Sequence, residues 1–249
     1  MQSSSLKKIL MTGLIGLIFL TSSTYAAPDY AREKRWANEV TPELIFSDEI
    51  YLKQQNGHQF LGLLAEAEKS HLAIIVVHGM GLHPDWGIIG MLRRGLYDAG
   101  YSTLSIQMPV LAANASYKAY PSLFPDAVER LRLAAAFLRT KGHRKIVIVS
   151  HSNGSRMSRV YMRNNPQAIA AWVALSLTQN DTFQGIRAPV LDLYGEHDLP
   201  HVLTAVDKRK QSLLNKHSEQ KRISDADHFF AGTEKAMRDA VKNFLKKIR

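Results

Sequence analysis

Five short segments rich in apolar residues recur along the chain, and each has the length of a strand that is buried on both faces. The clearest is Leu72–Val77, in which every residue is apolar. The others lie at residues 103–107, 145–149, 171–177 and 190–194, and the short segment 221–224 is a candidate for a last strand. Such continuous runs are typical of parallel sheets, because helices cover both faces of these sheets.

A hairpin is expected in front of these runs. Two strand-like segments, residues 43–53 and 58–67, flank the pair Asn56-Gly57. This pair favours a tight turn because both residues tolerate a positive φ. The pattern therefore predicts that the domain opens with two antiparallel strands.

Segments with apolar residues at helical spacing separate the buried runs. We expect helices over residues 85–100, 126–142 and 153–163, and a closing helix whose apolar face contains Met237, Ala240, Phe244 and Ile248. Residues 27–42 are polar and show no clear period, so we expect an exposed lead-in with little function. Strands that alternate with helices behind a hairpin predict one α/β domain, with a mostly parallel sheet of about eight strands and helices on both faces.

The first 26 residues have the pattern of a secretory signal peptide. Lys7 and Lys8 precede an apolar run at residues 9–20, and the small-residue sequence Thr24-Tyr25-Ala26 follows it. The run is about a dozen residues long, against roughly 20 for a membrane-spanning helix. We therefore expect cleavage after Ala26, a domain of residues 27–249 and a periplasmic or secreted location; an uncleaved anchor is the alternative.

Composition and charge narrow the function further. The chain has no cysteine, which excludes thiol catalysis, cysteine-ligated metals and disulfides. Its formal charge of +10 becomes +8 once the two signal lysines are removed. We expect no nucleic-acid partner, because the protein is exported and its basic residues are scattered. The closing helix carries a stripe of basic residues, Lys235, Arg238, Lys242 and Lys246. We interpret this stripe as a solvated helix face; weak attraction to an anionic envelope surface is the alternative.

One serine stands where a buried strand turns sharply into a helix. The segment Ser150-His151-Ser152-Asn153-Gly154 follows the apolar run 145–149 and precedes the helix at 153–163. In such an elbow the residues two before and two after the nucleophile must be small, and Ser150 and Gly154 meet this condition for Ser152. The elbow has Ser150 where glycine is usual. Ser152 is therefore the expected nucleophile.

A serine nucleophile needs a base and an acid, which in this kind of sheet follow in the order acid, then histidine. Asp198 lies in the loop that leaves the strand at 190–194, and His228 lies between the last strand and the last helix. We expect these two residues to complete the triad, since Asp192 lies within a strand and Asp225 outside the expected loop. A metal site made of His197, Asp198 and His201 is the weaker alternative, because Pro200 interrupts the spacing.

Two backbone amides are expected to form an oxyanion hole. The amide of Asn153 lies at a helix N-terminus, and the turn His78-Gly79-Met80-Gly81 follows the first buried strand. We assign the second amide to Met80, with Gly81 as the alternative. His78 itself is expected to be a hydrogen-bonded structural residue.

The motifs at residues 78–81, 150–154, 195–198 and 227–230 together resemble the α/β-hydrolase superfamily, including its uncharacterised exported bacterial members. The resemblance spans nearly the whole mature chain. It implies an α/β-hydrolase fold and a serine hydrolase, without naming a substrate. From the triad we expect cleavage of an ester-type bond through an acyl-enzyme, and no metal or cofactor. A catalytically silent member that binds an envelope partner is the alternative.

The spacing of the strands also predicts how substrate reaches the site. Only residues 178–189 separate two expected strands, which is an ordinary connection and too short for a cap domain. Residues 109–125, which include Tyr117, Tyr120, Leu123 and Phe124, either cover one rim of the pocket or form a plain surface loop. We expect an open site that accepts short-chain or surface-displayed esters.

Overall fold

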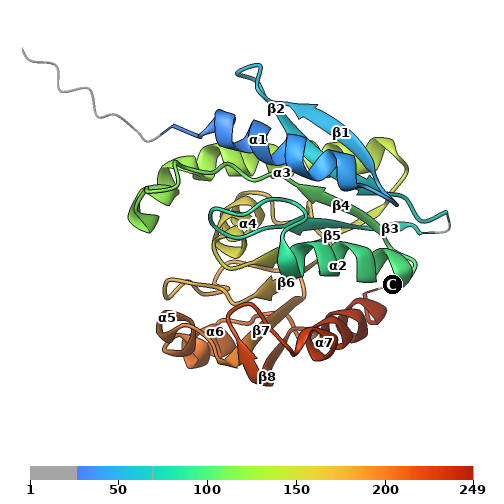
Figure 1. The fold of residues 1–249 in the computed structure, drawn as a ribbon. Helices are drawn as coiled ribbons and strands as arrows, with labels where there is room; N and C mark the ends of the chain where they lie inside the picture. The colour runs from blue at the N-terminus through green and yellow to red at the C-terminus, as the bar shows by residue number, and fades with distance from the viewer. Residues whose placement is uncertain (1–26, 69, 249) are drawn as a thin grey trace, which may run out of the picture.

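The protein forms one eight-stranded sheet, in the order β1-β2-β4-β3-β5-β6-β7-β8. The structure is a computed structural model that describes residues 27–68 and 70–248; the expected signal peptide lies outside them. The sheet runs from the β1–β2 hairpin to β8 at the opposite edge (Figure 1). The strands are β1 (Asp48–Lys53), β2 (Gln59–Ala65), β3 (Leu72–Val77), β4 (Ser102–Ile106), β5 (Lys145–His151), β6 (Ala171–Leu175), β7 (Val190–His197) and β8 (Glu219–Asp227).

The predicted hairpin and parallel sheet are confirmed. β1 pairs antiparallel with β2, and Gly57 in the turn has φ of 88°. β2 is antiparallel to β4, and every pairing from β4 through β3 to β8 is parallel. β1 begins five residues later than expected, because Thr41–Glu43 forms a short 3-10 helix that contains Pro42.

Helices cover both faces of the sheet, as the continuous apolar runs require. They are α2 (Gly87–Asp98), α3 (Phe124–Thr140), α4 (Asn153–Asn164) and α7 (Glu234–Lys246). On β3, Ile75 packs in the cluster that contains α3 and α4, whereas its neighbour Ile74 packs in the cluster that contains α2 and α7. Successive residues of a strand point to opposite faces, so both positions must be apolar.

No cap domain interrupts the fold. Residues 176–189, between β6 and β7, contain neither helix nor strand. Two short helices that the sequence did not indicate, α5 (Pro200–Leu203) and α6 (Val206–Gln211), follow β7 instead. Within the described residues, no helix has the length and apolar character needed to cross a membrane.

The expectation of an irregular lead-in at residues 27–42 is wrong. Residues Tyr30–Val40 form helix α1, which begins where the Asp29 carboxylate accepts a hydrogen bond from the Arg32 amide at 2.9 Å. α1 lies along the β1–β2 hairpin (Figure 1). Its buried residues Glu33, Ala37 and Val40 do recur at helical spacing. The pattern was hidden because one of the three is a charged glutamate.

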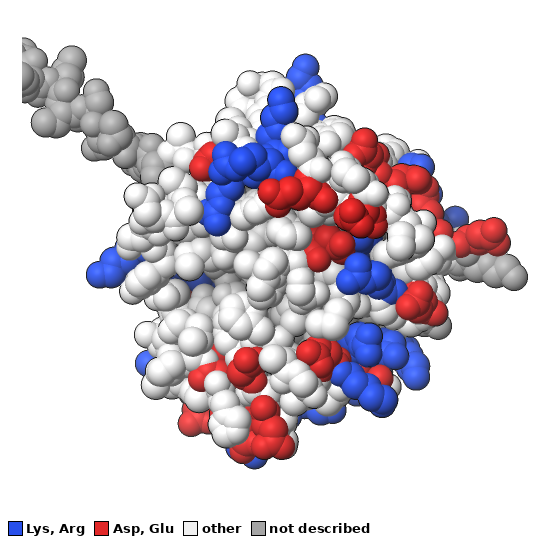
Figure 2. All heavy atoms as spheres, viewed as in Figure 1, with Lys and Arg blue, Asp and Glu red and all other residues white. Residues whose placement is uncertain are grey.

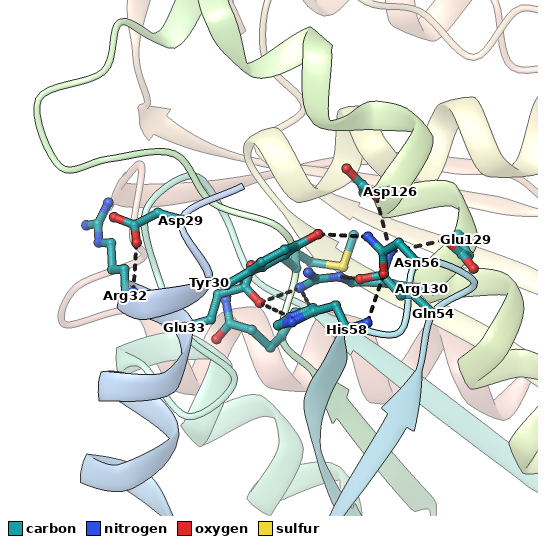
Figure 3. Close-up of polar contacts among 12 residues, drawn as sticks. Asp29, Tyr30, Arg32, Glu33, Gln54, Asn56, His58, Asp126, Glu129 and Arg130 are labelled. Atoms are coloured by element: carbon teal, nitrogen blue, oxygen red, sulfur yellow. Dashed lines mark hydrogen bonds and ion pairs between the residues drawn. The ribbon is translucent and has the colours of Figure 1, made fainter. Parts of the chain in front are cut away.

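The charge of Glu33 is compensated inside the protein. Its Oε2 lies 3.0 Å from Nη1 of Arg130 on α3 and 3.0 Å from Nε2 of His58 on the hairpin (Figure 3). The Arg130 side chain is fully buried, and it also donates to Gln54 Oε1 at 2.8 Å and to the Gln107 carbonyl at 3.0 Å. A buried ionic network therefore attaches α1 to the rest of the domain.

Replacing Glu33 with Ala is expected to lower the free energy of unfolding by about 3–5 kcal/mol, because Arg130 is left as a buried charge without its carboxylate. Urea denaturation followed by circular dichroism measures this change. Glu39→Ala, at an exposed position of the same helix, is the matched control and is expected to change stability by about 0.5 kcal/mol or less. Equal effects of the two substitutions would show that the network contributes nothing.

Candidate active site

Ser152 lies in the sharp turn between β5 and α4. Its backbone has φ of 55° and ψ of −124°, a region that a non-glycine residue rarely adopts. A Cβ atom at Gly154 would lie 2.2 Å from the His78 carbonyl oxygen, so only glycine fits there. Ser150 takes the other small position, and its hydroxyl accepts a hydrogen bond from Trp172 Nε1 at 2.8 Å. The buried Ser150 hydroxyl, which is present because this elbow has serine where glycine is usual, therefore has a hydrogen-bond partner.

The structure brings the three expected triad residues together. His228 Nε2 lies 3.0 Å from Ser152 Oγ, and His228 Nδ1 lies 2.6 Å from Asp198 Oδ1. Ser152 comes from the elbow, Asp198 from the end of β7 and His228 from the loop between β8 and α7. All three meet at the carboxyl edge of the parallel strands. This is the geometry of a nucleophile, a base and an orienting acid.

Asp198 is held as a carboxylate by four donors. Burial alone would raise the pKa of Asp198, but hydrogen bonds from His228, the Ser176 hydroxyl and the Leu199 amide outweigh burial and lower the pKa. The Ser176 bond measures 2.6 Å and the Leu199 bond 2.7 Å; the Gly195 amide adds a longer one at 3.3 Å. The acid is therefore charged at neutral pH and fixed in orientation.

Ser176 is a site residue that sequence reasoning missed. It follows the last residue of β6, is fully buried and has φ of 51°. Its position at the carboxyl end of a parallel strand is the one signal that could have identified it, because side chains at that edge converge on the site.

Two further histidines support the site as neutral hydrogen-bonding groups. Burial lowers the pKa of both His151 and His78 to about 3. His151 Nε2 donates to the His228 carbonyl at 2.9 Å and so holds the loop of the base. His78 Nδ1 donates to the Gly79 carbonyl at 2.8 Å, and its Nε2 accepts from the Met108 amide at 2.8 Å. This agrees with the structural role expected for His78.

The turn after β3 lies against the nucleophile, as an oxyanion hole requires. A Cβ atom at Gly79 would lie 3.2 Å from the Ser152 Cβ, so the backbone approaches closely at this point. Met80 and Asn153 both line the pocket around Ser152. The Gly81 carbonyl accepts a hydrogen bond from Arg32 Nη2 of α1 at 3.3 Å. The N-terminal helix, expected to have little function, therefore contacts this turn.

A cavity of about 410 Å³ opens beside Ser152. Its apolar lining comes from Met80, Leu82, Tyr117, Leu199 and Phe229, and its polar lining includes Asn153, Arg156, Thr178, Gln179 and His201. The segment at 109–125, which contains a 3-10 helix at Tyr117–Leu123, contributes only Tyr117 to the lining, while Tyr120 and Leu123 are buried in the core. The volume suits a small ligand.

The other acids considered for the triad have different partners. Asp192 is fully buried and pairs with Arg209 at 2.8 Å. Asp225 is exposed on β8, and the side chain of Asp227 accepts from the amides of Phe229 and Ala231, which holds the histidine loop.

The metal alternative is also not supported. The structure does not bring His197, Asp198 and His201 together as one ligand set. Among the described residues, the group of three potential ligands within metal-binding reach is Glu196, His197 and Asp225. Glu196 already accepts from the Asp225 amide at 3.1 Å.

The overall fold is similar to that of several hydrolases. A dienelactone hydrolase from Anabaena variabilis superposes with a TM-score of 0.68 at 18% identity, covering 81% of this chain and 97% of that one. A serine hydrolase without lid from Xanthomonas campestris superposes with a TM-score of 0.64 at 15% identity, covering 82% of this chain and 95% of that one. An esterase from Pyrococcus furiosus superposes with a TM-score of 0.64 at 14% identity, covering 81% of this chain and 92% of that one.

Comparisons by sequence are less informative. Residues 21–128 match a family described as a protein of unknown function, DUF3530. Among curated proteins, none matches this chain. At these identities the structural likeness shows the fold, which is the α/β-hydrolase fold without a lid, as the sequence predicts.

Proposed function

We propose that this protein, whose fold is that of the α/β-hydrolases, is a serine hydrolase that cleaves carboxylic esters. The observation that carries the proposal is the continuous hydrogen-bonded line from Ser152 through His228 to Asp198, with distances of 3.0 and 2.6 Å. This line lies beside a cavity of small-ligand size. Structural similarity to hydrolases and an esterase adds support.

The proposed reaction has two stages. Ser152 Oγ attacks the ester carbonyl while His228 Nε2 takes its proton, and the carboxylate of Asp198 stabilises the resulting imidazolium. The amides of Asn153 and Met80 bind the oxyanion. The imidazolium returns its proton to the leaving alcohol, which leaves an acyl-enzyme on Ser152. Water, activated by His228, then releases the acid.

Pre-steady-state hydrolysis of 4-nitrophenyl butyrate tests this function. The acyl-enzyme predicts a burst of 4-nitrophenol equal to about one molecule per active site, followed by slower steady release. The absence of any hydrolysis above the Ser152→Ala background, on this ester and on longer ones, would contradict the proposal.

We expect no interfacial activation, because a mobile lid is what produces it. Rates measured on esters of increasing chain length, below and above their aggregation thresholds, should follow the dissolved concentration and favour short acyl chains. A sharp rise in rate at the threshold would contradict an open site.

The triad needs no metal or coenzyme, since its residues supply the nucleophile, the base and the electrostatic stabilisation. Exhaustive chelation is therefore expected to leave the hydrolysis rate unchanged. A loss of activity that a divalent ion restores would contradict this part of the mechanism.

We further propose that the enzyme acts outside the cytoplasm, on small or surface-displayed esters, after cleavage behind Ala26. On the face drawn in Figure 2, Lys and Arg lie among Asp and Glu, both near α1 and near α7. This mixture agrees with at most weak attraction to an anionic surface. N-terminal sequencing of protein from an osmotic-shock fraction should give Ala27 as the first residue; recovery only in membranes, with Met1 intact, would overturn the proposal.

A further inference from the structure

The polar lining of the pocket around Ser152 consists of hydrogen-bond donors and neutral groups. Among its described lining residues there is no Asp or Glu, and Arg156 is the residue with a permanent charge. His201 also faces the pocket. Its pKa is lowered, mainly by burial and to a smaller extent by the nearby His228. Arg156 therefore supplies the permanent positive charge that a ligand meets in this pocket.

Arg156 is held in place from outside the pocket. Its Nε donates to Asp181 Oδ2 at 2.9 Å, and Asp181 does not line the cavity. Arg159 Nη1 lies 3.5 Å from the other oxygen of the same carboxylate. Two guanidinium groups thus share one carboxylate, which leaves one positive charge in excess. The guanidinium also lies 5.3 Å above the ring of Phe124.

A second donor next to Arg156 has no partner. Asn153 has 7% of its surface exposed, and Arg156 Nη1 donates to its Oδ1 at 3.5 Å. This contact directs the Asn153 oxygen toward Arg156, because the reverse orientation would set two donors against each other. Asn153 Nδ2 is buried and has no hydrogen-bond partner among the described residues. A buried donor without a partner is unfavourable unless a ligand supplies an acceptor.

Within the described residues, the hydrogen bonds of Arg156 come from its Nε and Nη1 and leave the Nη2 group unused. We infer that the preferred substrates are esters that also carry a carboxylate, which Arg156 Nη2 and Asn153 Nδ2 bind. This inference rests on the proposed ester hydrolysis and adds the substrate class. A carboxylate accepts hydrogen bonds from several donors at once, and guanidinium groups match its geometry.

Two pairs of substrates test the inference. 4-Nitrophenyl hexanoate and the mono-4-nitrophenyl ester of adipate have acyl chains of equal length, and the second carries a carboxylate at its end. 4-Methylphenyl acetate and 4-carboxyphenyl acetate place the difference on the alcohol. The measured quantity is the ratio of kcat/KM for the anionic ester to kcat/KM for the neutral ester.

In at least one pair, Arg156→Gln is expected to lower this ratio by roughly 10- to 100-fold, mainly through KM, since a hydrogen bond to a charged group is lost. Arg156→Lys keeps the charge and should recover part of the ratio. Arg159→Gln removes a cation bound to the same carboxylate but absent from the pocket lining. It removes the excess charge and keeps the donors of Arg156, so it should lower the ratio less than Arg156→Gln does. A ratio unaffected by Arg156→Gln in both pairs would overturn the inference.

A binding measurement separates this inference from the proposed function. Adipate is titrated into the Ser152→Ala protein by calorimetry, with and without Arg156→Gln. Binding that the second substitution weakens supports the carboxylate site even if no ester is hydrolysed. Hydrolysis of neutral esters without adipate binding would overturn the carboxylate site and leave the proposed hydrolysis intact.

Discussion

Replacement of Ser152 or His228 with Ala is expected to lower kcat by about a million-fold, because triad residues act as a unit and the loss of either removes the activated nucleophile. For the same reason, the double variant should be no slower than either single variant. The variants should still hydrolyse the ester roughly a thousand-fold faster than the uncatalysed reaction in water, because substrate binding and the oxyanion hole remain.

The measurement is the steady-state hydrolysis of 4-nitrophenyl butyrate, with circular dichroism to show that each variant is folded. Ser158→Ala is the matched control, since Ser158 is a buried serine on α4 that does not line the pocket. It should retain activity within a few-fold of the wild type. Near wild-type turnover by folded His228→Ala would contradict the assignment of the base.

Replacement of Asp198 with Asn is expected to lower kcat by about ten thousand-fold, as loss of the carboxylate does in other serine triads. An amide in this position presents its NH2 group to His228 Nδ1 and favours the wrong tautomer of the imidazole. It also supplies no charge to stabilise the imidazolium. The fold should be retained, because the amide oxygen, in the place of Oδ2, can still accept from the Ser176 hydroxyl and the Gly195 amide.

Asp225→Asn is the matched control for this variant. Asp225 is an exposed carboxylate near the base, with φ of 58°, which Asn also tolerates. Its replacement should leave kcat within a few-fold of the wild type. A large loss of kcat in Asp225→Asn, together with near wild-type kcat in Asp198→Asn, would show that the acid is wrongly assigned.

Much of the fold could be predicted from the sequence because its signals are local. The run Leu72–Val77 is apolar at every position, and both faces of β3 are in fact covered. The three candidate triad positions could be proposed because each follows an expected strand of the sheet, and parallel strands bring the loops at their carboxyl ends together. Ser150 and Gly154 selected Ser152 among neighbouring serines, since the tight turn tolerates only small residues there.

The features that were missed depend on partners distant in the sequence. Glu33 interrupts the apolar face of α1, and its burial is understandable only beside Arg130, 97 residues away. Ser176 and Arg156 belong to the site through contacts with Asp198 and Asp181, which no spacing along the chain indicates. The short helices α5 and α6 are too brief to show a clear period.

The most direct test of the central claim is covalent labelling of the purified protein with a fluorophosphonate probe, followed by peptide mapping. Such probes react with a serine that a neighbouring base activates. The triad predicts one labelled residue, Ser152, with no labelling of Ser152→Ala and strongly reduced labelling of His228→Ala. Wild-type protein that is folded but stays unlabelled, or label found on another serine, would contradict the claim that Ser152 is the nucleophile.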